Sequence, residues 1–255
     1  MNIKNIIKSF LNNLFSKTTK EGSIMNRPVT TLFLLMSMDG KISTGDTDTW
    51  DVDKDIPNID GDPATGLHQY YEEEQETDLW CLNSGRVLAK VGMNNAKGTP
   101  KKTPVTFAII DNNHLADTAI RFFSQKGKQV VIVTSNSSHP GFELEKELNN
   151  VKMLKYSGQL NPKQMLHNFK KLGCDAITIQ TGGTLNEMFL RHHLIDKVNI
   201  VMFPCLVGGK NTATLIDGNG PKSLKDIGVL KLTQCKPLKN SYVQLKYDVV
   251  NADKK

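Results

Sequence analysis

Short apolar runs recur along this chain, and the stretches between them carry apolar residues at helical spacing. Residues 29–36 are almost continuously apolar, which is typical of a strand buried on both faces of a sheet. Further runs of this kind predict strands over residues 78–83, 105–110, 129–134, 151–155, 176–180 and 198–203. The intervening pattern predicts helices over residues 64–76, 85–91, 115–125, 142–148, 162–172 and 185–192. For the helix over 162–172, Asn161 is a good N-cap, Pro162 suits the first helical position and Gly173 ends the helix.

The order of these segments predicts the fold class. Strands that alternate with helices of this length need crossover connections, so we expect a mainly parallel central sheet flanked by helices. The last two strands, 227–235 and 242–249, are joined by a short turn, and the second alternates apolar and polar residues. This alternation is typical of an antiparallel hairpin at a sheet edge. The prediction is an α/β protein with one domain over residues 26–251.

A glycine pair that follows a predicted strand is the most informative motif. The run 176–180 ends in Gln180, Gly182 and Gly183 come next, and a helical pattern begins at Leu185. Paired glycines allow a sharp turn and a close approach of the backbone. The first N–H groups of the following helix then attract anions such as a nucleotide pyrophosphate. A tight turn with nothing bound is the alternative.

Polar residues follow four of the predicted strands. Ligands of open α/β sheets bind beyond the carboxyl ends of the parallel strands, so these segments predict a dinucleotide-sized site. The segments are residues 37–41, 83–86, 134–136 and 181–184. Candidate phosphate contacts are Thr134, Ser135, Arg86 and Lys90, and a 2′-phosphate would favour NADP over NAD. The acidic residues 40–66 predict a long loop, and loops of that length are usually functional.

Composition narrows the function classes. Hydrophobic residues make up 38% of the 255 residues, which is enough for a core, and no run of about 18 apolar residues predicts a membrane span. The net charge of +6 is spread along the chain, so we expect no nucleic-acid partner. The four cysteines form no C-x-x-C pair, which indicates free thiols in a reducing cytoplasm. The six histidines lack ligand spacing, and we expect no metal site.

Residues 1–25 differ from the rest of the chain. Isoleucine, leucine and phenylalanine recur there at helical spacing, lysines accompany them, and the first acidic residue is Glu21. A basic amphipathic helix of this kind can lie on a membrane surface. The alternatives are a helix docked on the body, or an extension upstream of a second methionine, Met25. We expect one of these alternatives and no stable membrane insertion.

Several enzyme classes are disfavoured by missing motifs. The chain has no G-x-G-x-x-G, no Walker A motif and no G-x-S-x-G elbow. Hydride transfer from a nicotinamide needs orientation and electrostatics more than a catalytic triad, so a reductase stays compatible with the sequence.

Taken together, these segments resemble the C-terminal reductase domain of the riboflavin-biosynthesis enzyme RibD, a relative of dihydrofolate reductase. The resemblance runs from about residue 27 to residue 250. It is carried by residues 36–42, Trp50, and residues 182–185, 194–198 and 204–209. It implies a dihydrofolate reductase-like fold and a homodimer. The implied activity is an NADPH-dependent reduction at C1′ of a phosphoribosylamino-pyrimidine, as in 5-amino-6-(5-phosphoribosylamino)uracil reductase.

The resemblance also implies site residues. The pyrophosphate would be held by Gly182, Gly183, Thr184 and Leu185, and NADPH would lie along Trp50, Ser84, Gly85, Arg86 and Lys90. Asp39 would be the catalytic contact, and Ser37, Asp48 and Thr181 would face the substrate. Two of these residues have another interpretation: Asp39 as a turn former before Gly40, and Trp50 as a hydrophobic plug.

Two features depart from the family pattern. The family usually has Glu where this chain has Thr181, and its Thr-Val-Leu-Ala-Asp turn is Arg-Val-Leu-Ala-Lys at residues 86–90. The H-x-E and P-C-x-x-C motifs of the companion deaminase domain do not occur, so we expect at most the reductase half. Two alternatives therefore stay open. The protein could be a reductase with the same fold that acts on a pterin, on dihydrofolate or on another substrate. It could also bind NADPH without catalysis.

Overall fold

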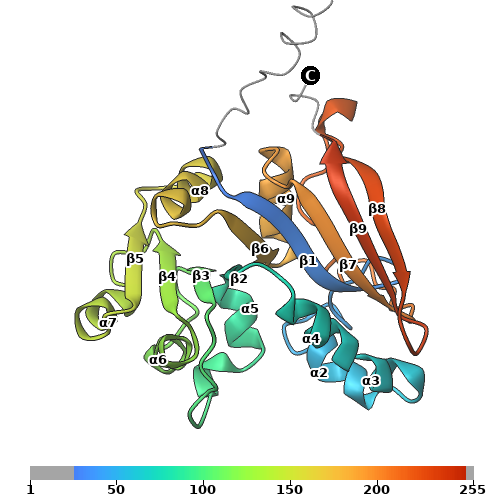
Figure 1. Cartoon of the computed structure of the whole chain (residues 1–255), viewed down its shortest axis with the longest axis horizontal. Coiled ribbons are helices and arrows are strands. Elements are labelled where there is room, and N and C mark those ends of the chain that lie inside the picture. Colours follow the sequence, from blue (N-terminus) through green and yellow to red (C-terminus); the bar gives the residue numbers. More distant parts are fainter. Residues whose placement is uncertain (1–25, 251–255) are drawn as a thin grey trace, which may run out of the picture.

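The computed structural model describes residues 26–250, so the expectations for residues 1–25 lie outside the described part of the chain. Within it, nine strands form one sheet in the order β5-β4-β3-β2-β6-β1-β7-β9-β8 (Figure 1). The strands are β1 (Val29–Ser37), β2 (Trp80–Ser84), β3 (Thr106–Ile110), β4 (Gln129–Thr134), β5 (Val151–Lys155), β6 (Ala176–Gln180), β7 (Lys197–Phe203), β8 (Val229–Pro237) and β9 (Val243–Val250). The α-helices are α2 (Val52–Asp55), α3 (Asp62–Gly66), α4 (His68–Gln75), α5 (Gly85–Lys90), α6 (Asp117–Lys126), α7 (Gly141–Glu147), α8 (Pro162–Lys171) and α9 (Gly183–Arg191).

Strands β1 to β7 run parallel, and β9 and β8 complete the sheet as an antiparallel pair. The chain leaves β1, builds β2 to β5 outward, and returns through α8 to insert β6 between β2 and β1. Strand β7 then pairs with the other side of β1. The carboxyl ends of β1, β2 and β6 therefore lie close together at one edge of the sheet. The predicted α/β class, mainly parallel sheet and C-terminal hairpin are confirmed.

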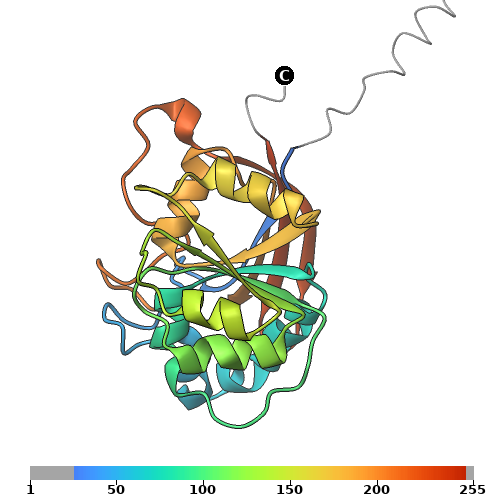
Figure 2. The same cartoon turned by 90° about the vertical axis from the view of Figure 1, so that its left-hand side faces the viewer.

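Helices cover both faces of the sheet (Figures 1 and 2). Helices α8 and α9 pack on one face in a core cluster that includes Phe169 and Phe189. On the other face, α6 and α7 cover the β2–β5 half, where Ile120 and Leu144 are buried. A separate cluster around Phe33 holds α2 and α4 against β1 and β7. The cluster that contains Ile120 and the cluster around Phe33 lie on the same face of the sheet and leave polar residues of β2 and β6 between them.

Local signals explain most of the boundaries. The Asn161 side chain accepts a hydrogen bond from Gln164 N at 3.1 Å, so the predicted cap of α8 is confirmed. Gly173 has a φ of +89° just past that helix, where glycine is favoured. Helix α9 begins at Gly183, two residues earlier than predicted, because Gly182 takes the N-cap position.

Two predictions near the start of the domain were wrong. Residues 40–66 are not loop throughout, because Asp51 caps the short helix α2 and Ile56 is fully buried after it. The predicted helix 64–76 is interrupted, and α3 and α4 replace it. In β9, Gln244 is buried instead of facing solvent, because its amide nitrogen donates to Glu73 and Asn199. None of the described helices has the length and apolar character needed to cross a bilayer.

Candidate active site

A cleft of about 500 Å³ opens at the carboxyl ends of β2 and β6, between the two helix groups on one face of the sheet. One wall consists of α2 and α4, and α5 forms the opposite wall. The first turn of α9 lines its end. The cleft therefore lies where open α/β sheets bind their ligands, at the point where the strand order reverses. Of the four predicted polar segments, it brings together two, which follow β2 and β6.

The first turn of α9 offers hydrogen-bond donors to this cleft. The N–H groups of Gly183 and Thr184 have no acceptor among residues 26–250, since a helix leaves its first amides unpaired. Both residues line the cleft, together with Gly182 and Leu185. The helix dipole adds partial positive charge at this end. The first turn of α9 therefore contributes two N–H groups, without an acceptor in the described part of the chain, from residues that line the cleft, and anion binding there stays a prediction.

The two glycines have different structural roles. A Cβ added to Gly182 would contact only Val87 Cγ2, at 3.8 Å. A Cβ on Gly183 would collide with the backbone oxygen of Thr214 and the carboxylate of Asp217. Gly183 is therefore required by the packing of α9 against the 214–217 segment, whereas Gly182 leaves room on its cleft side. Neither glycine has a positive φ, so the turn itself does not demand them.

Helix α5 brings two cations to the opposite wall. The Arg86 guanidinium contacts the Asp48 carboxylate at 2.9 Å, and both side chains are mostly exposed at the cleft. Lys90 Nζ lies 3.6 Å from Asp51 Oδ2 deeper in the same wall. These ion pairs tie the loop after β1 to α5. Ser84 precedes α5 and also lines the cleft.

The strand β6 ends in a buried polar network under the cleft. The Cys81 thiol donates to Gln180 Oε1 at 2.6 Å, and Gln180 Nε2 donates to Glu74 Oε1 at 2.7 Å. The Thr181 hydroxyl donates to Asn186 Oδ1 at 2.6 Å, although the residue lines the cleft. The Thr181 side chain is therefore buried, and its hydroxyl is engaged by the first turns of α9.

Asp53 stands out among the carboxyls of the α2–α4 wall. It lines the cleft and is exposed to solvent, and no donor or cation among the described residues contacts its carboxyl. Desolvation by the surrounding wall, followed by the negative charges of Asp51 and Glu74, raises its pKa from 3.8 to about 7. Because Asp53 is also exposed to water, solvation offsets part of this desolvation, but the direction of the shift favours the protonated carboxyl.

Asp39 and Ser37 lie outside the cleft-lining residues. The Ser37 hydroxyl donates to Asp39 Oδ1 at 2.5 Å, and the N–H groups of Val207 and Gly208 donate to the same carboxylate. These bonds, led by that of Ser37, lower the pKa of Asp39 to about 2. The geometry thus favours the turn-forming interpretation of Asp39, because its carboxylate accepts from Ser37 within the turn and from Val207 and Gly208 of a neighbouring loop.

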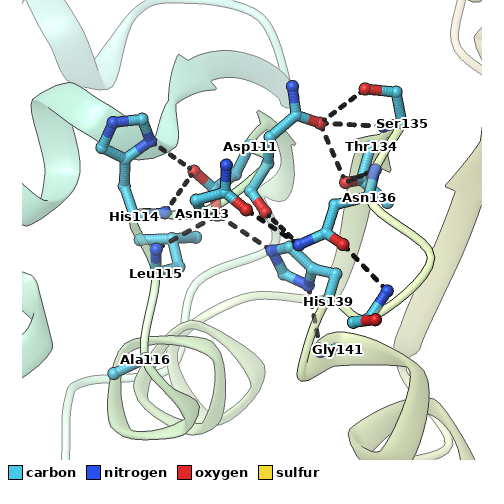
Figure 3. A network of polar contacts seen from close by, with 12 residues as sticks. Asp111, Asn113, His114, Leu115, Ala116, Thr134, Ser135, Asn136, His139 and Gly141 are labelled. Carbon is cyan, nitrogen blue, oxygen red and sulfur yellow. Dashed lines mark hydrogen bonds and ion pairs between the residues drawn. The ribbon is translucent and has the colours of Figure 1, made fainter. Parts of the chain in front are cut away.

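Thr134 and Ser135 are also separated from the cleft, because β3 lies between β2 and β4. Figure 3 shows how these residues are occupied: the Thr134 and Ser135 hydroxyls and Ser135 N all donate to Asn112 Oδ1. Beneath them, the buried Asp111 accepts from His139 Nε2 at 2.9 Å. The loops after β3 and β4 are therefore held by hydrogen bonds to each other. Thr134 and Ser135, which were predicted to contact phosphate, bind Asn112 instead.

Trp50 and Gly85 likewise do not line the cleft. The Trp50 ring lies against Gly45, where a Cβ would collide with it, and 48% of the residue is exposed. Gly85 is needed because its backbone approaches the buried Asp111 carboxylate too closely for a side chain. Trp50 therefore matches neither earlier interpretation fully, since it is not a buried plug and the cleft does not reach it.

Sequence reasoning missed several residues of the cleft. They are Asp51, Asp53, Tyr70, Glu74, Gln180 and Asp217. The acidic composition of residues 40–66 was a usable signal for Asp51 and Asp53, but of these acids only Asp48 was selected, through the family resemblance. Glu74 had no such signal, because one acid in the sequence Glu-Glu-Glu is indistinguishable from a solvated helix face until α4 is placed against β1.

Comparisons with known proteins agree with this architecture. The 2,5-diamino-6-ribosylamino-4(3H)-pyrimidinone 5′-phosphate reductase of Methanothermobacter thermautotrophicus is 24% identical over 209 residues, covering 81% of this chain and 91% of that protein. The reductase of the same name from Aquifex aeolicus is 22% identical over 209 residues, covering 82% and 91%.

Solved structures show the same fold. RibD of Acinetobacter baumannii superposes with a TM-score of 0.62 at 14% identity, over 89% of this chain and 59% of that chain. The Saccharomyces cerevisiae riboflavin biosynthesis reductase Rib7 gives a TM-score of 0.54 at 14% identity, over 96% and 99%. The RibD C-terminal domain family matches residues 28–243, which is most of the sequence. The chain therefore belongs to the RibD C-terminal domain family.

Proposed function

We propose that this protein is an NADPH-dependent reductase of a riboflavin-pathway pyrimidine, similar to 5-amino-6-(5-phosphoribosylamino)uracil reductase. The observation that carries the proposal is the pair of free N–H groups at the start of α9, which face a cleft at the carboxyl edge of a parallel sheet. Family membership supports the reaction class.

The residues of the cleft fit a dinucleotide coenzyme. Gly183 N and Thr184 N would hold the pyrophosphate, Gly182 leaves the backbone accessible beside them, and Arg86 supplies a cation from the opposite wall. The coenzyme would supply the hydride. The protein itself would bind and orient both reactants and limit the access of water. Two ion pairs between α5 and the 48–51 segment, Arg86–Asp48 and Lys90–Asp51, help to close one side of the cleft.

The substrate proposal rests on the relatives and on the polar wall opposite α5. Relatives reduce a ribosylamino-pyrimidinone phosphate, as their names state. In this chain the carboxyls of Asp53 and Glu74 line that wall, and an aminopyrimidine carries several N–H donors and ring acceptors that carboxyl groups can bind. Such a wall can orient the ring without the glutamate that the family usually has before its glycine pair.

Assembly and setting are part of the same proposal. We expect a homodimer, supported by β8, an edge strand whose nine residues are all exposed and which includes Leu230 and Leu232. The four cysteines are free, and Cys81 and Cys174 are buried, which suits a reducing cytoplasm.

A turnover assay tests the function. Purified protein is mixed with NADPH and either 5-amino-6-(5-phosphoribosylamino)uracil or the 2,5-diamino-pyrimidinone counterpart, and absorbance of the reduced nicotinamide is followed. Oxidation with one of the two supports the reductase. NADPH binding without oxidation would favour a non-catalytic binder, or a reductase of another substrate, for which dihydrofolate is the first compound to assay.

A further inference from the structure

We propose that Asp53 is the general acid of the reaction, donating the proton that the substrate needs as it accepts a hydride. This inference rests on the proposed reductase function and goes beyond it by assigning the proton transfer to one side chain. It is carried by the position of Asp53 in the cleft and by the partners of the two carboxylates beside it.

Three carboxyls share the α2–α4 wall, but their partners differ. Asp51 Oδ1 accepts from Asp53 N at 3.0 Å, and Asp51 Oδ2 lies 3.6 Å from Lys90 Nζ, so a donor and a cation contact this carboxylate. Glu74 accepts from Gln180 Nε2 at 2.7 Å. Asp53 is left without a donor among the described residues, while it lines the same cleft as the α9 amides. Of the three, it is the carboxyl that most readily keeps a proton.

The charged groups around Asp53 act in one direction. Asp51 at the start of α2 and Glu74 on α4 are negative, and Lys90 on α5 is engaged by Asp51. Tyr70 and Tyr71, also on α4, have raised pKa values, first because of burial and then because of Asp53, so they stay neutral at working pH. The described residues contain no group of three His, Cys, Asp or Glu placed to hold a metal ion. In the described part of the chain, only the N-terminal end of the four-residue helix α2 favours ionised Asp53, while burial and the two neighbouring carboxylates oppose it, in keeping with its pKa of about 7.

A hydride transfer to a carbonyl or imine also needs a proton donor close to the reacting atoms. When a carbonyl or imine carbon accepts a hydride from a reduced nicotinamide, the π electron pair moves to the oxygen or nitrogen, and the coenzyme is left oxidised. That heteroatom then takes the proton from the Asp53 carboxyl. Because Asp53 is exposed through the mouth of the cleft, water can return a proton to the carboxylate before the next turnover.

Kinetics of Asp53→Asn test the assignment. We expect kcat to fall by about 10²- to 10⁴-fold, the range of general acid catalysis, with the Kd for NADPH unchanged. The wild-type kcat should decline as pH rises above about 7, and this decline should be absent in the variant. Asp53→Glu, which keeps a carboxyl, should recover at least about tenfold over the asparagine variant. Asp60→Asn is the matched control, because Asp60 is exposed and lies outside the cleft.

A second readout does not depend on activity. Because the folded-state pKa of Asp53 is raised, the folded protein binds more protons than the unfolded chain between about pH 4 and pH 7. The wild type therefore loses stability over this window relative to Asp53→Asn. The difference in melting temperature (variant minus wild type) should grow from pH 4 to pH 7 and stay level above it. Asp60→Asn should show no such window.

The outcomes separate this inference from the function on which it rests. If the wild type oxidises NADPH with neither pyrimidine nor dihydrofolate, the proposed function fails, and the acid role fails with it. If the wild type is active and Asp53→Asn retains its rate and its decline above pH 7, only the acid role is overturned. A melting-temperature difference that does not change between pH 4 and pH 7 overturns the acid role as well.

Discussion

At the residue scale, two adjacent glycines at the start of α9 have different structural roles. Gly182 and Gly183 are equivalent in the sequence, where both predict a close approach to a phosphate. The structure separates them, because only Gly183 lies against protein atoms, those of Thr214 and Asp217. Gly183 is therefore required by packing, whereas Gly182 is an open position at the cleft. Sequence alone could not divide the two roles, because the 214–217 segment is about 30 residues away and no local pattern places it there.

This difference predicts that the same substitution destabilises the protein at Gly183 and has little effect at Gly182. Gly183→Ala places a Cβ against the Thr214 backbone oxygen, so it should lower the free energy of unfolding by about 1–3 kcal/mol, as overpacking does. Gly182→Ala meets only ordinary van der Waals contact and should change that free energy by less than about 0.5 kcal/mol. Urea denaturation of both variants measures the two values. Equal losses would show that the packing around α9 differs from that described.

At the scale of elements, the sequence predicted the helices whose ends are set by nearby residues better than the short helices held by distant contacts. Helix α8 was predicted with its cap, because Asn161, Pro162 and Gly173 act within one turn of the helix ends. The segment 40–66 was predicted less well. Its short helices α2 and α3 have few residues, and they are held by tertiary contacts such as the burial of Val52 and Ile56 against the Phe33 cluster. Elements of four or five residues carry too little periodicity to be recognised before their packing partner is known.

At the scale of the whole molecule, the strand order decided which site predictions succeeded. Helix–strand alternation predicted a parallel sheet, but it did not reveal that β6 inserts between β2 and β1. That insertion places the α9 turn beside Arg86 and Lys90, which the sequence had also selected. It leaves β4 two strands from β2, so Thr134 and Ser135 lie away from the cleft and contact Asn112 instead. Residues at the same edge of a sheet share a site only when their strands are neighbours.

The exposed edge strand gives a prediction at the same scale. Leu230 and Leu232 stand on one side of β8, and about half of each residue is exposed. If a second copy covers this strand, the combined Leu230→Lys and Leu232→Lys substitutions should convert a dimer into a monomer of 28.4 kDa. Light scattering after size exclusion gives the mass. Leu79→Lys, at an exposed site next to β2 on the other side of β1 from β8, is the control. A monomeric wild type would contradict the proposed assembly.

The central claim is that the first turn of α9 binds the phosphates of NADPH, and titration of NADPH into Gly182→Asp and Gly182→Asn tests it most directly. Both side chains fit at an N-cap position where an added Cβ has room, and both can cap α9, so melting temperatures should stay at or above that of the wild type. The two variants differ mainly in charge. If the account is right, the aspartate variant binds NADPH at least about tenfold more weakly than the asparagine variant, a difference of about 1.4 kcal/mol, because its carboxylate repels the pyrophosphate. Equal affinities of the aspartate variant, the asparagine variant and the wild type, with all three folded, would contradict it.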